Sequence, residues 1–307
     1  MNCQKTGKFL VLCSFISRLC VVTILFLFAF WTDFHNFKLS YNNARLVGLD
    51  AGKSMQWFYQ MSESFFSWFG EPELIARGFG GMIWSIRLFD FQFTDPIAFF
   101  SFFLKTHQFE MGLFLGLTIP IAMVLLFGRV FCSFICPASI LFYVISRMRR
   151  LSEKFLYFPN WQSNRYMAWG ILAGGLITAM IAGHGIWSLL LPYVAFGQVI
   201  FQGIAFGALS LSLWALLFFC LADVLFGYQF TCRNICPTGR LLGWLGSLSF
   251  ITITRNKNQC LKECTSCSLI CPYQVDPKKD QTRDCALCGE CLTICPGNCL
   301  SIERRWK

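Results

Sequence analysis

The chain has 307 residues, of which 55% are hydrophobic and 14% charged, and its mean hydropathy is +0.54. Soluble domains carry about 25% charged residues, so this composition excludes a water-soluble globule, a disordered chain and a collagen-like chain. The length and the cysteine placement exclude a disulfide-knotted miniprotein, because nine of the 17 cysteines fall between Cys260 and Cys299 in the only long hydrophilic stretch. The composition predicts a membrane protein with a small cysteine-bound metal domain.

Four stretches are long and apolar enough to cross a bilayer, which takes roughly 20 residues because the hydrocarbon is about 30 Å thick. They are residues 10–31, 109–127, 166–191 and 204–226. The alternative for the first stretch is a cleaved signal peptide, which is disfavoured because no small-residue cleavage site follows it. The sequence therefore predicts an α-helical membrane protein with about four transmembrane helices.

The basic residues predict the orientation in the membrane. The short connection between the second and third stretches holds six Arg or Lys residues against one acid, Glu153, and the tail after Gly227 holds eleven against six acids. Because basic loops stay in the cytoplasm, we expect a multi-pass protein of the bacterial inner membrane with both termini cytoplasmic. The net charge of +10 then reflects topology and attraction to anionic membrane lipid, and it does not indicate a nucleic-acid partner.

Four segments follow from this division. They are the N-terminus and first helix (1–31), a periplasmic or interfacial segment (32–108), a membrane domain (109–250) and a cytoplasmic iron–sulfur domain (251–307). Within the second segment, residues 55–69 are amphipathic and rich in Trp and Phe, which is typical of a helix lying on the membrane surface. The alternative is a loop that covers the chain's own helices.

The tail contains the strongest motif, two runs of four cysteines that each end in Cys-Pro. The second run has the spacing C-x2-C-x2-C-x3-C-P of bacterial [4Fe–4S] proteins, in which the fourth cysteine binds the other cluster. This rule predicts two [4Fe–4S] clusters, the first held by Cys260, Cys264, Cys267 and Cys295, and the second by Cys285, Cys288, Cys291 and Cys271. Structural zinc is the alternative, but it does not account for the third cysteine and the Cys-Pro of each run. One extra residue separates Cys260 from Cys264, and Cys299 is expected to be a small buried residue.

Two further cysteine pairs stand 100 residues apart. Each is a C-x3-C-P motif that follows an apolar stretch, and the residues are Cys132, Cys136, Cys232 and Cys236. If each pair begins a short helix, both sulfurs lie on one side of it, and two facing pairs make a four-sulfur site that suits zinc or iron. A thiol–disulfide relay is a second interpretation. The third is that the prolines end helices and the cysteines only pack.

With these motifs in place, the chain resembles the NapH/MauN family of membrane ferredoxin-type proteins. The resemblance covers nearly the whole chain and is most specific at residues 95–100 (DPIAFF), 235–247 (ICPTGRLLGWLGS) and 283–306. It implies a quinol dehydrogenase component that passes electrons from the membrane quinone pool toward a periplasmic redox system. The partners that it implies are a periplasmic ferredoxin-type protein and multihaem cytochromes c. The alternative function is an assembly factor that supplies electrons for building a metallocentre in another enzyme.

A site that oxidises quinol needs an apolar cleft and a group that accepts a proton. The candidates are His107, Glu110 and His184, which all fall on the predicted outer side of the membrane. Ionisable groups at or in a membrane are functional candidates, and histidine titrates near neutral pH. The alternative is that these side chains only cap helices and form hydrogen bonds at the interface.

Overall fold

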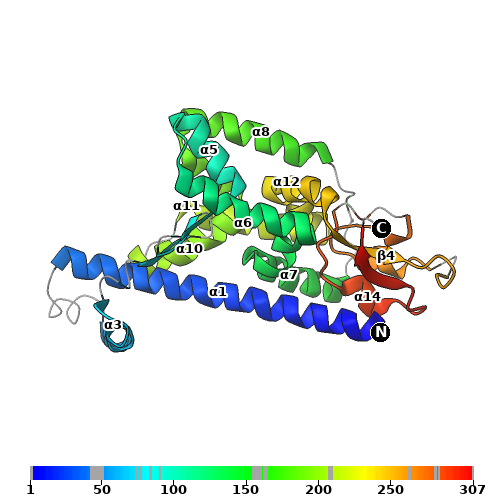
Figure 1. Cartoon of the computed structure of the whole chain (residues 1–307), viewed down its shortest axis with the longest axis horizontal. Coiled ribbons are helices and arrows are strands. Elements are labelled where there is room, and N and C mark those ends of the chain that lie inside the picture. The colour runs from blue at the N-terminus through cyan, green and yellow to red at the C-terminus, as the bar shows by residue number, and fades with distance from the viewer. Residues whose placement is uncertain are drawn as a thin grey trace.

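The computed structural model describes residues 3–41, 52–72, 75, 78–82, 85–89, 91–153, 161, 165–206, 210–261, 264–279, 282 and 284–305. Most of these residues are helical (Figure 1). The longer helices are α1 (Cys3–Tyr41), α3 (Gly52–Ser67), α5 (Pro96–Thr106), α6 (Met111–Phe127), α7 (Ala138–Ser152), α8 (Arg165–Ala182), α10 (Pro192–Phe206), α11 (Leu211–Phe226) and α12 (Pro237–Leu245). Short helical turns are η1 (Phe131–Ile135), η2 (His184–Ile186), α9 (Trp187–Leu190), η3 (Thr231–Ile235), η4 (Gly246–Leu248), α13 (Ser266–Ile270), η5 (Pro277–Lys279) and α14 (Glu290–Ile294).

Helix α1 runs along the long axis of the molecule and carries the clearest membrane signal (Figure 1). Its segment Cys3–Thr32 is long and apolar enough to cross a membrane, and it is the one such helix in the part of the chain that the structure describes. The other apolar helices have 10–17 residues: Pro96–Thr106, Met111–Phe127, Tyr166–Ile181 and Leu211–Phe226. Helix length therefore identifies one spanning candidate where the sequence predicts four.

The predicted third and fourth stretches are divided differently in the structure. Helix α8 ends at Ala182 because Gly183 has φ +96°, a left-handed conformation that favours glycine. The chain then forms η2, α9 and α10, so the predicted span 166–191 ends early and the residues after it form helix instead of a loop. A continuous apolar run does not reveal where a helix is interrupted, since the interruption depends on a single glycine.

Two small antiparallel sheets complete the fold. Strands β1 (Phe79–Met82), β2 (Ser85–Leu88) and β3 (Phe91–Thr94) form the first, with Ser85 paired to Thr94. This sheet lies in the predicted interfacial segment, and it packs against α1 and α6. Strands β4 (Ile251–Arg255) and β5 (Leu300–Arg304) pair at the two ends of the tail and frame its cysteine loops.

The main core lies where the two C-x3-C-P segments meet α10 and α9. Trp187 and Tyr193 are each 1% exposed there, and the Trp187 indole N–H donates to Ser101 Oγ at 2.8 Å. Because a buried indole N–H needs an acceptor, Ser101 on α5 fixes the position of that helix against α9.

The N-terminus of α1 docks on the tail, so both ends of the chain lie at the same end of the molecule (Figure 1). Gln4 Nε2 donates to the Cys295 carbonyl at 3.2 Å. At Gly7 the helix approaches α14 so closely that a Cβ would lie 2.7 Å from both Leu292 Cβ and Thr293 N. Since part of this contact is backbone, no rotamer change can relieve it.

We expect Gly7→Ala to weaken this docking and to lower the free energy of unfolding by about 1–3 kcal/mol, the usual cost of overpacking. The matched control is Gly112→Ala on α6, where a Cβ meets nothing within 4 Å. That control should keep or gain stability, because alanine is the better helix former. Thermal unfolding in detergent measures both variants. Maleimide labelling of Cys3, which is 6% exposed, should speed up only in Gly7→Ala; equal behaviour of the two variants would refute the docking.

Candidate metal centres

The tail cysteines gather around two separate cavities. One is lined by Cys260, Cys264, Cys267 and Cys295. The other is lined by Cys271, Cys285, Cys288 and Cys291. Each set takes three cysteines from one run and one from the other, as the sequence rule predicts. The structure thus brings both predicted donor sets together, and binding of a cluster by them stays a prediction.

The Cys-Pro steps place the fourth cysteine of each set. Cys271 and Cys295 end α13 and α14 with ψ of 115° and 110°. A residue before proline favours this extended conformation and cannot continue a helix. The chain therefore leaves the short helix at the cysteine, and the thiol is presented to the neighbouring cavity.

The two cavities differ in burial. At the second, burial raises the pKa of Cys271, Cys285 and Cys288 to about 12 each, so these thiols are protonated at neutral pH and would have to lose their protons to bind a cluster. At the first, a hydrogen bond with Ser266 lowers the pKa of Cys264, which is partly exposed. The first site is the more open of the two.

The first cavity has a fifth sulfur. Cys299 lines it, and its Sγ lies 3.5 Å from Cys295 Sγ. Cys299 is buried, as expected from the sequence, but its place in the cavity wall makes it a spare donor beside the irregular Cys260–Cys264 spacing. Its position outside the C-x2-C-x2-C-x3-C-P pattern left no signal for this in the sequence.

The C-x3-C-P pairs lie on π-helical turns. Instead of beginning an α-helix, each pair spans a turn that ends at the second cysteine, whose amide donates to the carbonyl five residues earlier: Cys136 to Phe131 and Cys236 to Thr231, both at 2.8 Å. The expected short helix begins only after the second cysteine: Pro137 caps α7, and Pro237 is the first residue of α12, where proline is favoured. Such π-turns are frequent at functional sites.

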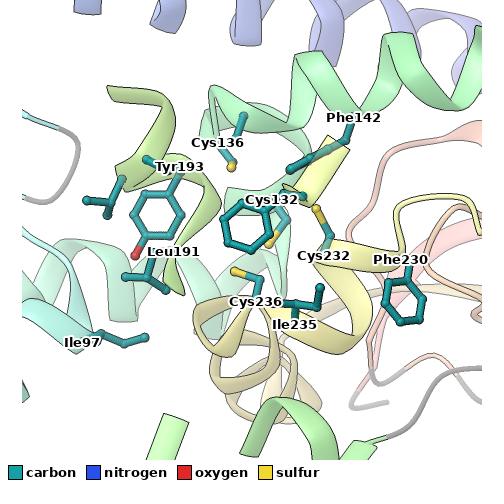
Figure 2. Close-up of a cluster of buried hydrophobic side chains, with 14 of the residues drawn as sticks. Ile97, Cys132, Cys136, Phe142, Leu191, Tyr193, Phe230, Cys232, Ile235 and Cys236 are labelled. Carbon is teal, nitrogen blue, oxygen red and sulfur yellow. The ribbon is translucent and has the colours of Figure 1, made fainter. Parts of the chain in front are cut away.

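The two π-turns face each other and form one four-cysteine site. Figure 2 shows the side chains of Cys132, Cys136, Cys232 and Cys236 pointing into the same interior region. All four are 7–8% exposed and lie in one cluster of buried side chains. The predicted meeting of the two pairs is therefore present in the structure, between segments 100 residues apart.

The sulfurs do not converge on a single point. Among the described residues, no group of three or more His, Cys, Asp or Glu side chains is placed to hold one metal ion. A single zinc ion needs its ligands at about 2.0–2.3 Å. A [4Fe–4S] cluster has a different requirement, because each thiolate binds a different iron.

Arg129 and Tyr273 join the four-cysteine site to the second tail cavity. The buried Arg129 guanidinium contacts Cys132 Sγ at 3.3 Å, donates to the Cys232 carbonyl, and lies 4.9 Å from the centre of the Tyr273 ring. Tyr273 lines the second cavity, and its hydroxyl donates to the Cys132 carbonyl at 3.4 Å. Ser133 also donates to the carbonyl of Ala286, another lining residue. The two sites therefore share a wall.

The three candidates for a quinol site are not gathered in one place by the described contacts. His107 ends α5 with φ +53°, Glu110 precedes α6, and both side chains are exposed. The His184 backbone lies in η2, and its side chain is outside the described residues. A large apolar cavity lies elsewhere, between α1, β3 and α6, and its one carboxylate is Asp95. Sequence reasoning missed Asp95, although it begins the DPIAFF segment.

Comparison with known proteins identifies the relatives of the chain. A family model described as "4Fe-4S binding domain" matches residues 109–154, which include Cys132 and Cys136. The ferredoxin-type protein NapH of Escherichia coli is 29% identical over 70% of this chain and 76% of its own length. NapH of Haemophilus influenzae is 23% identical over 86% and 98%, and the methylamine utilization ferredoxin-type protein MauN of Paracoccus denitrificans is 29% identical over 57% and 60%.

No solved structure matches the chain significantly. The relatives cover most of its length and carry the ferredoxin-type description, and the family model adds iron–sulfur binding. The chain is therefore a relative of the ferredoxin-type proteins NapH and MauN.

Proposed function

We propose that this iron–sulfur protein is a membrane component of a quinol dehydrogenase, which takes electrons from the quinone pool and supplies a periplasmic redox system. The observation that supports this most strongly is the shared wall between the four-cysteine site in the helical part and the second cysteine cavity of the tail. The proposed partners are a periplasmic ferredoxin-type protein and a multihaem cytochrome c.

The donor sets of the tail fit two [4Fe–4S] clusters, since each cavity presents four thiols from the two runs. A [4Fe–4S] cluster supplies one-electron redox chemistry. Oxidation of one quinol releases two electrons and two protons, so two one-electron centres match its electron count. The chain's own contribution is to hold the thiols and to connect the second cavity to the helical part.

We propose a further iron–sulfur centre at the four-cysteine site. The match of residues 109–154 to a 4Fe-4S binding family supports it, because Cys132 and Cys136 are the cysteines inside that match. A thiol–disulfide relay remains the competing chemistry, and it requires no iron.

For the membrane, we propose four crossings by α1, α6, α8 and α11, with both termini on the cytoplasmic side. The last three helices have 17, 18 and 16 residues and are about 24–27 Å long, so their flanking turns would complete each crossing of a hydrocarbon layer about 30 Å thick. Docking of the α1 N-terminus on the tail supports a common side for the two termini.

Iron analysis tests the assignment of centres. We expect about twelve irons per chain in the anaerobically purified protein. Replacing Cys132 and Cys232 together by serine should remove about four irons and leave both tail centres visible by EPR after dithionite reduction. Cys20→Ser, which changes an exposed cysteine on α1, is the control and should keep all the iron. About eight irons in the wild type with no loss in the double variant would favour the thiol relay.

The shared wall predicts the order in which the two tail sites are reduced. Of the two tail cavities, the second contacts the four-cysteine site through Tyr273 and Ser133 in the described part of the chain. Disabling the second site with Cys288→Ser should therefore prevent menadiol from reducing the first site. Disabling the first site with Cys264→Ser should leave reduction of the second site unchanged. EPR after mixing with menadiol measures both. Reduction of the first site in Cys288→Ser would refute the order, and wild-type centres that menadiol cannot reduce would favour the assembly-factor function.

Epitope tags at the two termini test the topology. In sealed right-side-out membrane vesicles, we expect both tags to resist added protease and to be digested together once detergent opens the vesicles, because the basic connections remain inside. A periplasmic protein trapped in the vesicles is the control for sealing. Digestion of either tag in sealed vesicles would contradict the proposed orientation.

A further inference from the structure

A large cavity lies beside the four-cysteine site, and none of the functions above uses it. Its volume is about 510 Å³, within the usual range of small-molecule sites of about 300–1,000 Å³. The walls come from α1, from β2 and β3, from α6 and from the π-turn η1, and nearly all of the lining is aliphatic or aromatic. The lining includes Ile24 on α1 and Ile119 on α6, which are 44% and 38% exposed. The cavity is therefore bordered by apolar side chains at the molecular surface.

Two neighbouring polar residues at the end of β3 interrupt this apolar lining. The Thr94 side chain is 2% exposed, and its hydroxyl has no hydrogen-bond partner within the described part of the chain. Buried polar groups are nearly always paired, because an unpaired one loses its hydration without compensation. An unpaired hydroxyl in the wall of a cavity of this size therefore points to a ligand that carries a polar atom.

Asp95 is the second polar group. Its carboxylate accepts two hydrogen bonds from the protein and can still accept more. Its Oδ1 accepts from the Ile97 amide at 2.8 Å and caps α5, while its Oδ2 accepts from the Tyr193 hydroxyl at 2.8 Å. A carboxylate has about four acceptor positions, so a ligand hydroxyl can still donate to it. These two hydrogen bonds also hold the carboxylate in one orientation.

The polar end of the cavity is next to the four-cysteine site. Phe131 and Ile135 line the cavity, and each is the direct chain neighbour of a cysteine, Cys132 or Cys136. From Asp95, the hydrogen bond to Tyr193 continues to Thr238 Oγ1 at 3.0 Å, two residues beyond Cys236. The cavity thus approaches both cysteine pairs.

We propose that this cavity binds the head group of a quinone or quinol, with Thr94 and Asp95 as its hydrogen-bonding residues. The Thr94 hydroxyl donates to one ring oxygen, a quinol hydroxyl donates to Asp95, and the apolar tail follows the lining between α1 and α6. A lipid acyl chain fits the apolar walls equally well, but it offers nothing to Thr94 or Asp95. This assignment rests on the proposed function, and it places the quinol site at Thr94 and Asp95 instead of His107, Glu110 and His184.

The test is photolabelling of the purified full-length protein with an azido-quinone that carries a short isoprenoid tail. Peptide mapping should place the label on α1, β3 or α6. Protection by unlabelled menadione gives a dissociation constant that does not depend on electron transfer. Thr94→Val should raise that constant about threefold to tenfold, as expected for loss of one neutral hydrogen bond, and Thr94→Ser should restore it. Asp95→Asn should raise the constant for protection by menadiol, measured anaerobically, about tenfold or more, because the quinol and not the quinone carries the hydroxyl that donates to Asp95.

Thr178→Val on α8 is the matched control, because it removes an exposed hydroxyl that bonds only within its own helix. Unchanged iron content and dithionite-reduced EPR spectra show that a variant is folded. Protection in folded Thr94→Val and Asp95→Asn equal to the wild type, or label confined to α8 or the His107 region, overturns the proposal. Label in the cavity together with wild-type centres that menadiol cannot reduce would support the binding site and refute the quinol dehydrogenase.

Discussion

The buried guanidinium of Arg129 is the contact on which the arrangement of the redox sites depends. Burying a charge is costly unless every donor direction meets an acceptor or a ring. Arg129 meets the sulfur of Cys132 from the first half of the chain, the carbonyl of Cys232 from the second half, and the ring of Tyr273 from the tail. Three segments far apart in sequence must therefore come together before this charge is accommodated.

The Arg129 guanidinium leaves no room for a side chain at position 239, where a Cβ would lie 2.4 Å from it. Gly239 therefore allows α12 to approach Arg129.

The two halves of the helical part form their cysteine pairs with the same local structure. Each apolar helix, α6 or α11, ends at a glycine with positive φ, Gly128 or Gly227, and leads into a π-turn. A proline then follows the second cysteine, where Pro137 caps α7 and Pro237 begins α12. A π-turn holds one residue more than an α-helical turn. The proline that follows has no N–H to donate, so the turn does not continue as a regular α-helix. This geometry turns both thiols of a pair toward the facing turn, and neither half could form the site alone.

Sequence reasoning predicted the features that depend on local spacing. The Cys-Pro rule assigned the eight tail cysteines to the two sets that the cavities bring together, and the 100-residue offset indicated that the two pairs meet. Other features depend on single residues or on tertiary contacts, which explains why they were missed. The break at Gly183, the π-turns and the three-stranded sheet leave no periodic signal in a uniformly apolar sequence. Asp95 was overlooked for a similar reason: an Asp-Pro step is the ordinary start of a helix, and nothing in the sequence shows that this cap faces a cavity.

The N-cap role of Asp95 explains how a carboxylate can lie in an apolar wall. The amide of Ile97 and the hydroxyl of Tyr193 solvate it from the protein side, as hydrogen bonds must when a charge is removed from water. Thr94 has no such arrangement, although it is more deeply buried than Asp95. A fold that needed only a stable wall would favour valine at position 94, since valine has the same shape and adds no unpaired group. The hydroxyl is therefore best explained by a molecule that enters the cavity, and its place beside η1 puts that molecule next to the cysteines with which it would exchange electrons.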